Sequence, residues 1–227
     1  MTVRLISISR PVGDVAPDTA SLLAFCARVS STANQSNHET GRKLLASLVK
    51  RQEWSPFEMV SPTMEIVTTR DIARQILRHR SFSFQEFSQR YAAVDAPPVF
   101  REARLQHETD RQMSVETDNA ELQDHWRWAQ EEVAAVAFAT YRGFVAKGIA
   151  KEVARSILPE GMTESRLFMA GTLRSWIHYI GIRADQKTQK EHRLIAEEIG
   201  RIIAGEFPEG EAGHPRLERE DGGWLVD

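Results

Sequence analysis

The chain has little cysteine, no long apolar run and no excess of positive charge, and each shortage excludes a class of proteins. Its single cysteine, Cys26, rules out an intrachain disulfide and a zinc site made of several cysteines. Because Cys26 lies in the apolar run "SLLAFCARVS", we expect it to pack in the core. No run approaches the ~20 apolar residues of a membrane span, and the start "MTVRLISISR" is too short and strand-like for a signal peptide. The sequence therefore predicts a cytoplasmic protein with no membrane partner.

The charge balance excludes a protein that attracts polyanions through its overall field. Lysine and arginine together number 29 against 32 for aspartate and glutamate, so the net charge is −3 at pH 7. Such a chain has no general attraction for nucleic acid or anionic lipid, and no nucleic-acid partner is expected. Any site for an anion must therefore be local.

The usual signatures of metal, nucleotide and nucleophile sites are missing as well. The chain has no HExxH, no CxxC and no clustered histidine and aspartate spacing, so no metal is expected. It contains neither the GxGxxG of a dinucleotide-binding fold nor the GxxxxGK[ST] of a phosphate-binding loop. Ser88 has no evident base beside it in sequence, so covalent catalysis by a protein nucleophile has no support.

Apolar periodicity predicts an α/β chain that is rich in helices and has a small number of strands. Alternating β-branched residues predict strands at 3–9 and 63–69, and residues 163–171 are a further candidate strand. The helix that begins near residue 172 is expected to end near Gly181. Helical spacing is found at 18–31, 37–52, 70–80, 121–148, 151–159, 172–182 and 189–207.

The chain shows no internal repeat and no clear linker, so we expect residues 1–207 to form a single domain. Residues 101–120 are polar and poor in large apolar side chains, which is typical of a surface loop or insertion. Residues 208–227 are rich in glycine, proline and glutamate, and we expect a loose C-terminal tail there.

One stretch, "RHRSFSFQEFSQRY" at residues 78–91, combines cations, hydroxyls and aromatic rings without a gap. A solvated helix end explains the cations alone, since a positive charge there gains about 0.3–1 kcal/mol from the helix dipole. It gives no reason for Phe82, Phe84 and Phe87 to be interleaved with polar residues. Guanidinium groups and hydroxyls suit a phosphate, and rings suit stacking or a dry wall. The stretch favours a site for a flat anionic ligand, with an RNA- or nucleotide-binding module as an alternative.

A second candidate lies in "TLRSWIHYIGIRAD". Arg174 and His178 are four residues apart and share one face of a helix. Arg183 follows nine residues after Arg174 and would point the other way on a continuous helix, so we expect a bend at Gly181 that turns it back. Taken alone, His178 is better explained as a packed core histidine, and Arg155 on its short helix indicates nothing by itself.

What remains is a site rich in binding groups but without a nucleophile, which fits chemistry carried out by a bound cofactor. It resembles the signature of the flavin-dependent thymidylate synthases: Arg-His-Arg, seven residues, then Ser, followed closely by Arg-Tyr. The matching residues are Arg78, His79, Arg80, Ser88, Arg90 and Tyr91. The likeness covers most of residues 24–207, in "ARVSS", "WSPFEM", "ARQILRHR", "EVARSILP" and "LRSWIHYIGIRADQKTQKEHRLIAEEI".

This resemblance implies the family's α/β fold and the reductive methylation of dUMP to dTMP, a step of de novo dTMP biosynthesis. Methylenetetrahydrofolate would give the carbon, and NADPH would reduce a non-covalently bound FAD that delivers the hydride. No covalent enzyme nucleophile would be needed, and the enzyme would be a homotetramer whose active sites form between subunits. A flavin oxidase that consumes NADPH without methylating dUMP is the enzymatic alternative.

The resemblance also assigns roles at matching positions, with Arg183 as the catalytic residue that faces and polarises the uracil ring. The residues that contact FAD would be Ser55, Arg78, His79, Arg80, Glu86, Arg174 and His178. The residues around dUMP, chiefly its phosphate, would be Gln75, Arg78, Glu86, Ser88, Gln89, Arg90, Arg155 and Arg183. Many members have histidine at the position of Glu53 and asparagine at that of Gln85, so a histidine role in folate binding or proton handling does not carry over.

Overall fold

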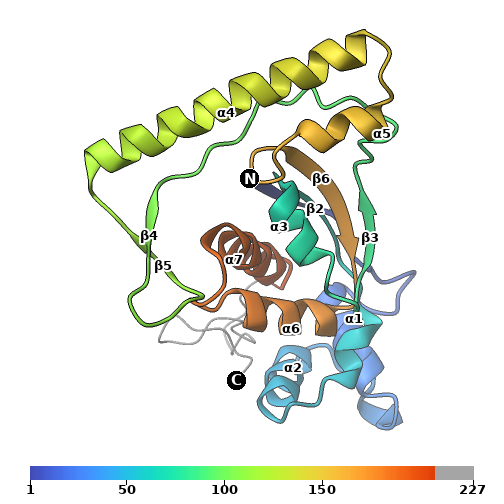
Figure 1. Cartoon of the computed structure of the whole chain (residues 1–227). Helices are drawn as coiled ribbons and strands as arrows, with labels where there is room; N and C mark the ends of the chain where they lie inside the picture. The colour runs from blue at the N-terminus through green and yellow to red at the C-terminus, as the bar shows by residue number, and fades with distance from the viewer. Residues whose placement is uncertain (208–227) are drawn as a thin grey trace.

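The centre of the computed structural model, which describes residues 1–207, is a four-stranded antiparallel sheet in the order β1-β2-β6-β3. The predicted loose tail at 208–227 lies outside the described residues. The strands are β1 (Thr2–Ser7), β2 (Thr63–Thr69), β6 (Glu164–Ala170) and β3 (Ser83–Glu86). The three predicted strands are therefore confirmed, as is the helix-rich α/β composition with a small central sheet (Figure 1).

One face of this sheet forms the main core because apolar residues alternate along its two central strands. In β2, Met64 and Ile66 are fully buried, while Glu65 between them is only partly buried. In β6, Leu167 and Met169 are fully buried at the same spacing. They join one core cluster with buried side chains of three helices, α3 (Arg70–Ile76), α6 (Leu173–Arg183) and α7 (Lys190–Gly205).

The N-terminal helices complete this core. Helix α1 (Thr19–Ala27) begins where the Asp18 side chain accepts a hydrogen bond from the Ser21 backbone N–H at 2.7 Å. A short 3-10 turn, η1 (Thr32–Asn34), leads to helix α2 (Gly41–Lys50). A second 3-10 turn, η2 (Ser55–Met59), follows with its proline in the first turn.

A long outer helix, α4 (Ala120–Ala146), forms a second cluster with the chain after β3 and with α5 (Lys151–Ala154) and η3 (Arg155–Ile157). There the Val94 N–H donates to the Tyr141 hydroxyl at 3.0 Å. Figure 1 shows α4 running along the outside of the molecule. No helix within residues 1–207 has the length and apolar character to cross a membrane. Large apolar side chains of α4 are exposed at Trp126, Trp128, Val133, Val136 and Phe144.

Residues 101–120, expected to be a surface loop or insertion, contain two short strands that the composition did not indicate. Strands β4 (Arg104–Gln106) and β5 (Ser114–Glu116) pair antiparallel as a separate hairpin. Its residues are largely exposed, and its apolar members Leu105 and Val115 are about half exposed. The hairpin therefore rests on backbone pairing and on the ionic contacts described below rather than on an apolar core of its own.

Two expectations about helix ends are wrong. The helix expected over 70–80 ends at Ile76, because the Arg78 and His79 N–H groups bond only three residues back, to Gln75 and Ile76. The expected bend at Gly181 is absent, because α6 runs unbroken to Arg183, and the Ala184 N–H still bonds four residues back. Arg183 therefore keeps the direction that a straight helix gives it.

Candidate functional site

The site residues predicted from the sequence fall into three groups in one chain. The His79 group is Gln75, Arg78, His79, Arg80 and Arg183; the Arg174 group is Ser55, Arg174 and His178; the Glu86 group is Glu86, Ser88, Gln89, Arg90 and Arg155.

The His79 group lies where the turn after α3 meets the end of α6. Arg183 Nε donates a hydrogen bond to His79 Nε2 at 2.9 Å. Accepting this bond requires an unprotonated Nε2, so the imidazole is neutral and carries its proton on Nδ1. Burial, followed by the charges of Arg183 and Arg78, lowers the pKa of His79 to about 4. At neutral pH, His79 therefore orients Arg183 without adding a charge beside it.

Aromatic rings pack behind this pair. The Tyr179 ring meets His79 edge-on with ring centroids 4.9 Å apart, and the Phe82 ring meets Trp176 with centroids 4.7 Å apart. Phe82 also covers Gly171, where an added Cβ would lie 2.4 Å from its Cδ1 atom. A larger residue at this position would displace the Phe82 ring, and this packing holds the turn that carries Arg78, His79 and Arg80.

The Arg174 group lies against η2. The Arg174 guanidinium pairs with Glu58, and the His178 ring lies 5.3 Å, centroid to centroid, from the Trp54 ring. Burial, followed by the Arg174 charge, lowers the pKa of His178 below its ordinary value. Ser55, the first residue of η2, is exposed beside this pair of rings. The group combines a cation, a hydroxyl and two flat rings at the surface.

The His79 and Arg174 groups lie on opposite faces of α6. Arg174 and Arg183 are nine residues apart, which corresponds to a rotation of about 180° around the helix. Each guanidinium accordingly has a different partner, Glu58 for Arg174 and His79 for Arg183. A single chain does not bring these two groups together.

The Glu86 group begins at the last residue of β3. Ser165 Oγ, on the neighbouring strand β6, donates to Glu86 Oε1 at 2.8 Å. The guanidinium of Arg70, whose side chain is 8% exposed, lies 3.9 Å from the same oxygen, and burial lowers the pKa of Arg70. Arg155 is near enough for its charge to act on Arg70. Glu86 is therefore fixed by a hydroxyl and a buried cation from neighbouring elements.

Two further members of the Glu86 group follow the strand. Gln89 is buried, and its Nε2 has no hydrogen-bond partner within residues 1–207. Arg90 Nε lies 3.2 Å from Glu152 Oε2, with both side chains more than half exposed. A buried amide donor without a partner is costly to maintain, so this turn is suited to a ligand that accepts hydrogen bonds.

Sequence reasoning missed three residues that support these groups, namely Tyr179, His192 and Arg70. The Tyr179 hydroxyl and His192 Nε2 are 3.0 Å apart, and His192 is fully buried. Its position was readable, because His192 precedes Ile195 and Ile199 at the helical spacing of the buried face of α7. Arg70 gave no such signal, since a cation at the start of α3 is ordinarily solvated.

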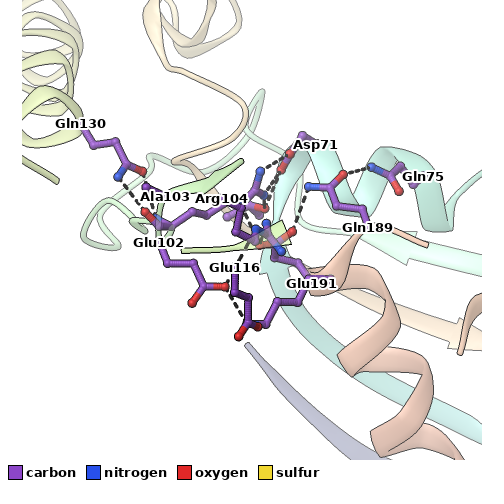
Figure 2. A network of polar contacts seen from close by, with 12 residues as sticks. Asp71, Gln75, Glu102, Ala103, Arg104, Glu116, Gln130, Gln189 and Glu191 are labelled. Atoms are coloured by element: carbon purple, nitrogen blue, oxygen red, sulfur yellow. Dashed lines mark hydrogen bonds and ion pairs between the residues drawn. The ribbon is translucent and has the colours of Figure 1, made fainter. Parts of the chain in front are cut away.

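Helix α3 is also tied to the segment that leads into the β4–β5 hairpin, as Figure 2 shows. Arg101 Nη1 donates to Asp71 Oδ2 at 2.8 Å. A separate bond ties α3 to the residue before α7, because Gln75 Nε2 donates to Gln189 Oε1 at 2.8 Å. Across the part of the chain that is described, no cluster of three or more histidine, cysteine, aspartate or glutamate side chains could hold a metal ion.

Comparison with known proteins identifies the family. A family model described as "Thymidylate synthase complementing protein" matches residues 12–209. The chain is 47% identical over 211 residues to a "Flavin-dependent thymidylate synthase" of Synechocystis sp. (strain ATCC 27184 / PCC 6803 / Kazusa), covering 92% of this chain and 96% of that protein. It is 43% identical over 208 residues to a "Probable flavin-dependent thymidylate synthase" of Paramecium bursaria Chlorella virus 1, with the same coverage of 92% and 96%.

A solved structure gives the same result for the fold. The chain matches a UMP/dUMP methylase from Streptomyces cacaoi, bound with 5-Br dUMP, with a TM-score of 0.75 and 26% sequence identity, covering 90% of each chain. The protein therefore belongs to the thymidylate synthase complementing protein family of enzymes. Its relatives carry the name flavin-dependent thymidylate synthase, so the family predicted from the sequence is confirmed.

Proposed function

We propose that this protein is a flavin-dependent thymidylate synthase acting in de novo dTMP biosynthesis. It methylates dUMP to dTMP with methylenetetrahydrofolate as carbon donor and NADPH-reduced FAD as hydride source, and residues 1–207 form its catalytic domain. One observation carries the proposal: the family's Arg-His-Arg turn is folded so that neutral His79 orients Arg183 through the 2.9 Å hydrogen bond. The names of its relatives support the same activity.

Arg183 is the catalytic residue of the proposed reaction. His79 takes the Nε donor, which leaves the terminal nitrogens of the guanidinium to donate to O2 of a uracil ring and to N3 once it has lost its proton. A positive charge held at that edge stabilises the anion that forms when N3 loses its proton, and this anion makes the ring carbon nucleophilic. Because the pKa of His79 is lowered to about 4, Arg183 is the single charge of this pair at neutral pH.

The Glu86 group suits the phosphate of dUMP. Ser88, the unpartnered Gln89 amide, Arg90 and Arg155 provide hydrogen-bond donors of the kinds that match phosphate oxygens. Arg78 and Gln75 complete the proposed contacts with the nucleotide. No nucleophile is assigned to Ser88, because the proposed reaction needs none.

The Arg174 group fits the FAD that the family name implies. The Trp54 and His178 rings offer a flat wall, while Arg174 and Ser55 offer a cation and a hydroxyl for its pyrophosphate. Arg78, His79, Arg80 and Glu86 would hold the same cofactor from the other side. When bound, FAD supplies the hydride chemistry that the side chains of this chain cannot.

The positions of these groups support the proposal of shared sites in a homotetramer. The His79 and Arg174 groups face opposite sides of α6 within one chain. A second copy of the chain can place its Arg174 group beside the His79 group of the first. The exposed apolar side chains of α4, such as Trp128 and Val136, supply surface for such assembly.

The test is an assay of the purified protein supplied with FAD, NADPH, methylenetetrahydrofolate and dUMP labelled with tritium at C5. We expect a yellow protein that releases tritium to water and forms dTMP only when all four are present. A protein that cannot bind FAD would contradict the proposal. NADPH oxidation without dTMP formation would instead identify a flavin oxidase.

A further inference from the structure

Four hydrogen bonds, the first buried and the other three partly buried, join the Tyr179 hydroxyl to the Glu191 carboxylate. Tyr179 Oη lies 3.0 Å from His192 Nε2, and His192 Nδ1 lies 3.2 Å from Gln75 Oε1. Gln75 Nε2 donates to Gln189 Oε1 at 2.8 Å, and Gln189 Nε2 donates to Glu191 Oε2 at 2.9 Å. Figure 2 shows the last two bonds side by side. We name these five residues the interior chain.

The carboxylate at the end of the interior chain determines which group donates and which accepts in each of its hydrogen bonds. An ionised Glu191 accepts hydrogen bonds and cannot donate one, so Gln189 must turn its NH₂ toward it and its carbonyl toward Gln75. Gln75 must then donate to Gln189 and present its own carbonyl to His192. This requires the His192 proton on Nδ1 and leaves Nε2 to accept from the Tyr179 hydroxyl.

If the NH₂ and the carbonyl of the Gln75 amide exchanged places, the hydrogen bonds on both sides of Gln75 would be disrupted. Its NH₂ would face His192, and Gln189 would have to turn its carbonyl toward the Glu191 carboxylate. Two acceptors would then face each other in a partly buried place, which is unfavourable because neither oxygen has a donor there. The carboxylate therefore selects one orientation of the Gln75 amide.

His192 can couple the hydrogen bonds at its two ring nitrogens because the imidazole stays neutral. It is 0% exposed, and burial, followed by the charges of Arg183 and by His79, lowers its pKa to about 3. A neutral imidazole has one donor and one acceptor nitrogen, so fixing one fixes the other. His192 thereby joins Gln75 on α3 to Tyr179 on α6, whose ring packs against His79.

The start of the β4–β5 hairpin holds Glu191 in place. Its Oε1 atom pairs with the Arg104 guanidinium, and Arg101 Nε lies 3.8 Å from the same oxygen. The Arg104 side chain is 11% exposed and that of Glu191 is 13% exposed, so this carboxylate is largely shielded from solvent. Two cations from this segment therefore pair with the carboxylate at the end of the interior chain.

We propose that Glu191 and His192 are positioning residues that fix the orientation of the Gln75 amide in the nucleotide site, an inference that rests on the proposed function. With one N–H and one lone pair used inside the protein, Gln75 presents its other N–H and lone pair to dUMP in a single arrangement. The orientation of a residue in the proposed substrate site is thus set by a carboxylate that touches neither substrate nor cofactor.

The first measurement is the tautomer of His192 in the full chain labelled with ¹⁵N-histidine, read from its nitrogen chemical shifts by NMR. His192→Gln identifies the signal by its loss. We expect the proton on Nδ1 and no titration between pH 6 and 8. A proton on Nε2, or an imidazole that becomes charged in this range, would overturn the proposed direction. This readout does not depend on activity.

The second measurement compares Glu191→Gln with Glu116→Gln, which removes a neighbouring carboxylate that contacts Lys190 outside the interior chain. The amide that replaces the Glu191 carboxylate can donate as well as accept, so we expect a second His192 tautomer. The KM for dUMP should rise roughly tenfold, as for one lost hydrogen bond, with a much smaller change in kcat. An equal KM in the two variants would refute the positioning role.

A third comparison covers the case in which Glu191→Gln does not fold. His192→Leu should raise the KM for dUMP, and His192→Gln, which retains a donor and an acceptor, should restore part of the loss. Equal values in both variants would overturn the proposal. If His192 shows the expected tautomer but the protein does not bind dUMP, the proposed function and the positioning role are both refuted. The inferred direction of the hydrogen bonds would still be correct.

Discussion

The two faces of helix α6 differ in how firmly their side chains are held by partners within a single chain. On the inner face, Arg183 is held by neutral His79, and Tyr179 is held by His192. On the outer face, Arg174 is held by Glu58 in an ion pair whose side chains are both more than two-fifths exposed. Arg183 on the inner face is therefore held in one orientation, whereas Arg174 on the outer face can exchange Glu58 for another anion.

This difference follows from solvent exposure. An exposed ion pair contributes about 0–1 kcal/mol, so Arg174 can leave Glu58 for a ligand phosphate at small cost. The Tyr179–His192 contact is buried, and breaking it would leave polar groups without partners. We therefore expect changes on the inner face to affect turnover and stability, and changes on the outer face to affect cofactor binding.

The largest effect is expected for Arg183→Ala. It removes the cation proposed to stabilise charge on the uracil ring, and such donors contribute about a hundredfold or more to kcat. FAD binding should persist, because the Arg174 group is unchanged. The measurement is tritium release from labelled dUMP together with the flavin absorption of the purified variant. Near-normal turnover would refute the role assigned to Arg183.

Gly171→Ala tests the packing beneath the inner face. The new Cβ would lie 2.4 Å from Phe82 Cδ1, so the ring or the strand must shift. We expect a loss of roughly 1–3 kcal/mol in the free energy of unfolding, measured by denaturant titration.

Gly143→Ala is the matched control, since Gly143 lies within α4 and a Cβ there meets nothing within 4 Å. We expect it to leave stability unchanged or to raise it by up to about 1 kcal/mol, because alanine is the better helix former. Equal losses in the two variants would show that Phe82 packing is not the cause.

On the outer face, Arg174→Ala should weaken FAD binding roughly tenfold, the equivalent of one charge-assisted hydrogen bond. The dissociation constant can be measured by flavin fluorescence titration of the apoprotein. Glu58→Gln is the companion variant: it frees Arg174 from its ion pair and should leave FAD binding intact or strengthen it. Unchanged FAD affinity in Arg174→Ala would remove this residue from the cofactor site.

Acidification should also lower the stability of the folded chain. The folded-state pKa values of His79 and His192, about 4 and about 3, lie below the value of about 6.5 expected in the unfolded chain. The unfolded chain therefore binds protons first, and the contribution is present above pH 6.5 and lost as the pH falls toward 4.

Denaturant titrations between pH 7.5 and 5 measure this loss. The fully buried His192 should contribute a slope of up to about 1.4 kcal/mol per pH unit below pH 6.5. His192→Gln should have a shallower slope than the parent chain. Equal slopes would contradict the lowered pKa of His192.

The helices, the strands and the family signature could be predicted from the sequence, whereas the contacts between the site groups could not. Alternation in "TMEIVTT" predicted β2 correctly, because one face of that strand is buried. The phenylalanines of the signature were interpreted as ligand-facing, yet Phe82 and Phe84 pack against the core. A pattern of residue types does not distinguish a ring that faces a ligand from one that packs under the turn.

The direction of Arg183 depends on a helix end, which local sequence determines weakly. Gly181 suggested a bend, but the helix continues because Ile177 and Ile180 stay packed in the core. The interior chain was equally out of reach, because Gln75 and His192 lie 117 positions apart in the sequence and meet only when α3 packs against α7. The roles assigned to individual site residues by the family resemblance stay predictions.

The most direct test of shared sites is a mixing experiment with Arg183→Ala and Arg174→Ala, assayed at limiting FAD so that the weakened FAD binding of Arg174→Ala leaves it with little turnover of its own. If each site takes Arg174 from one subunit and Arg183 from another, subunit exchange after mild dissociation rebuilds native sites. Random pairing makes half of the subunit pairs mixed, and half of the sites in a mixed pair are native, so about a quarter of the parent turnover should return. Turnover that stays at the level of the separate variants would contradict a site assembled from the two faces of α6 in different subunits.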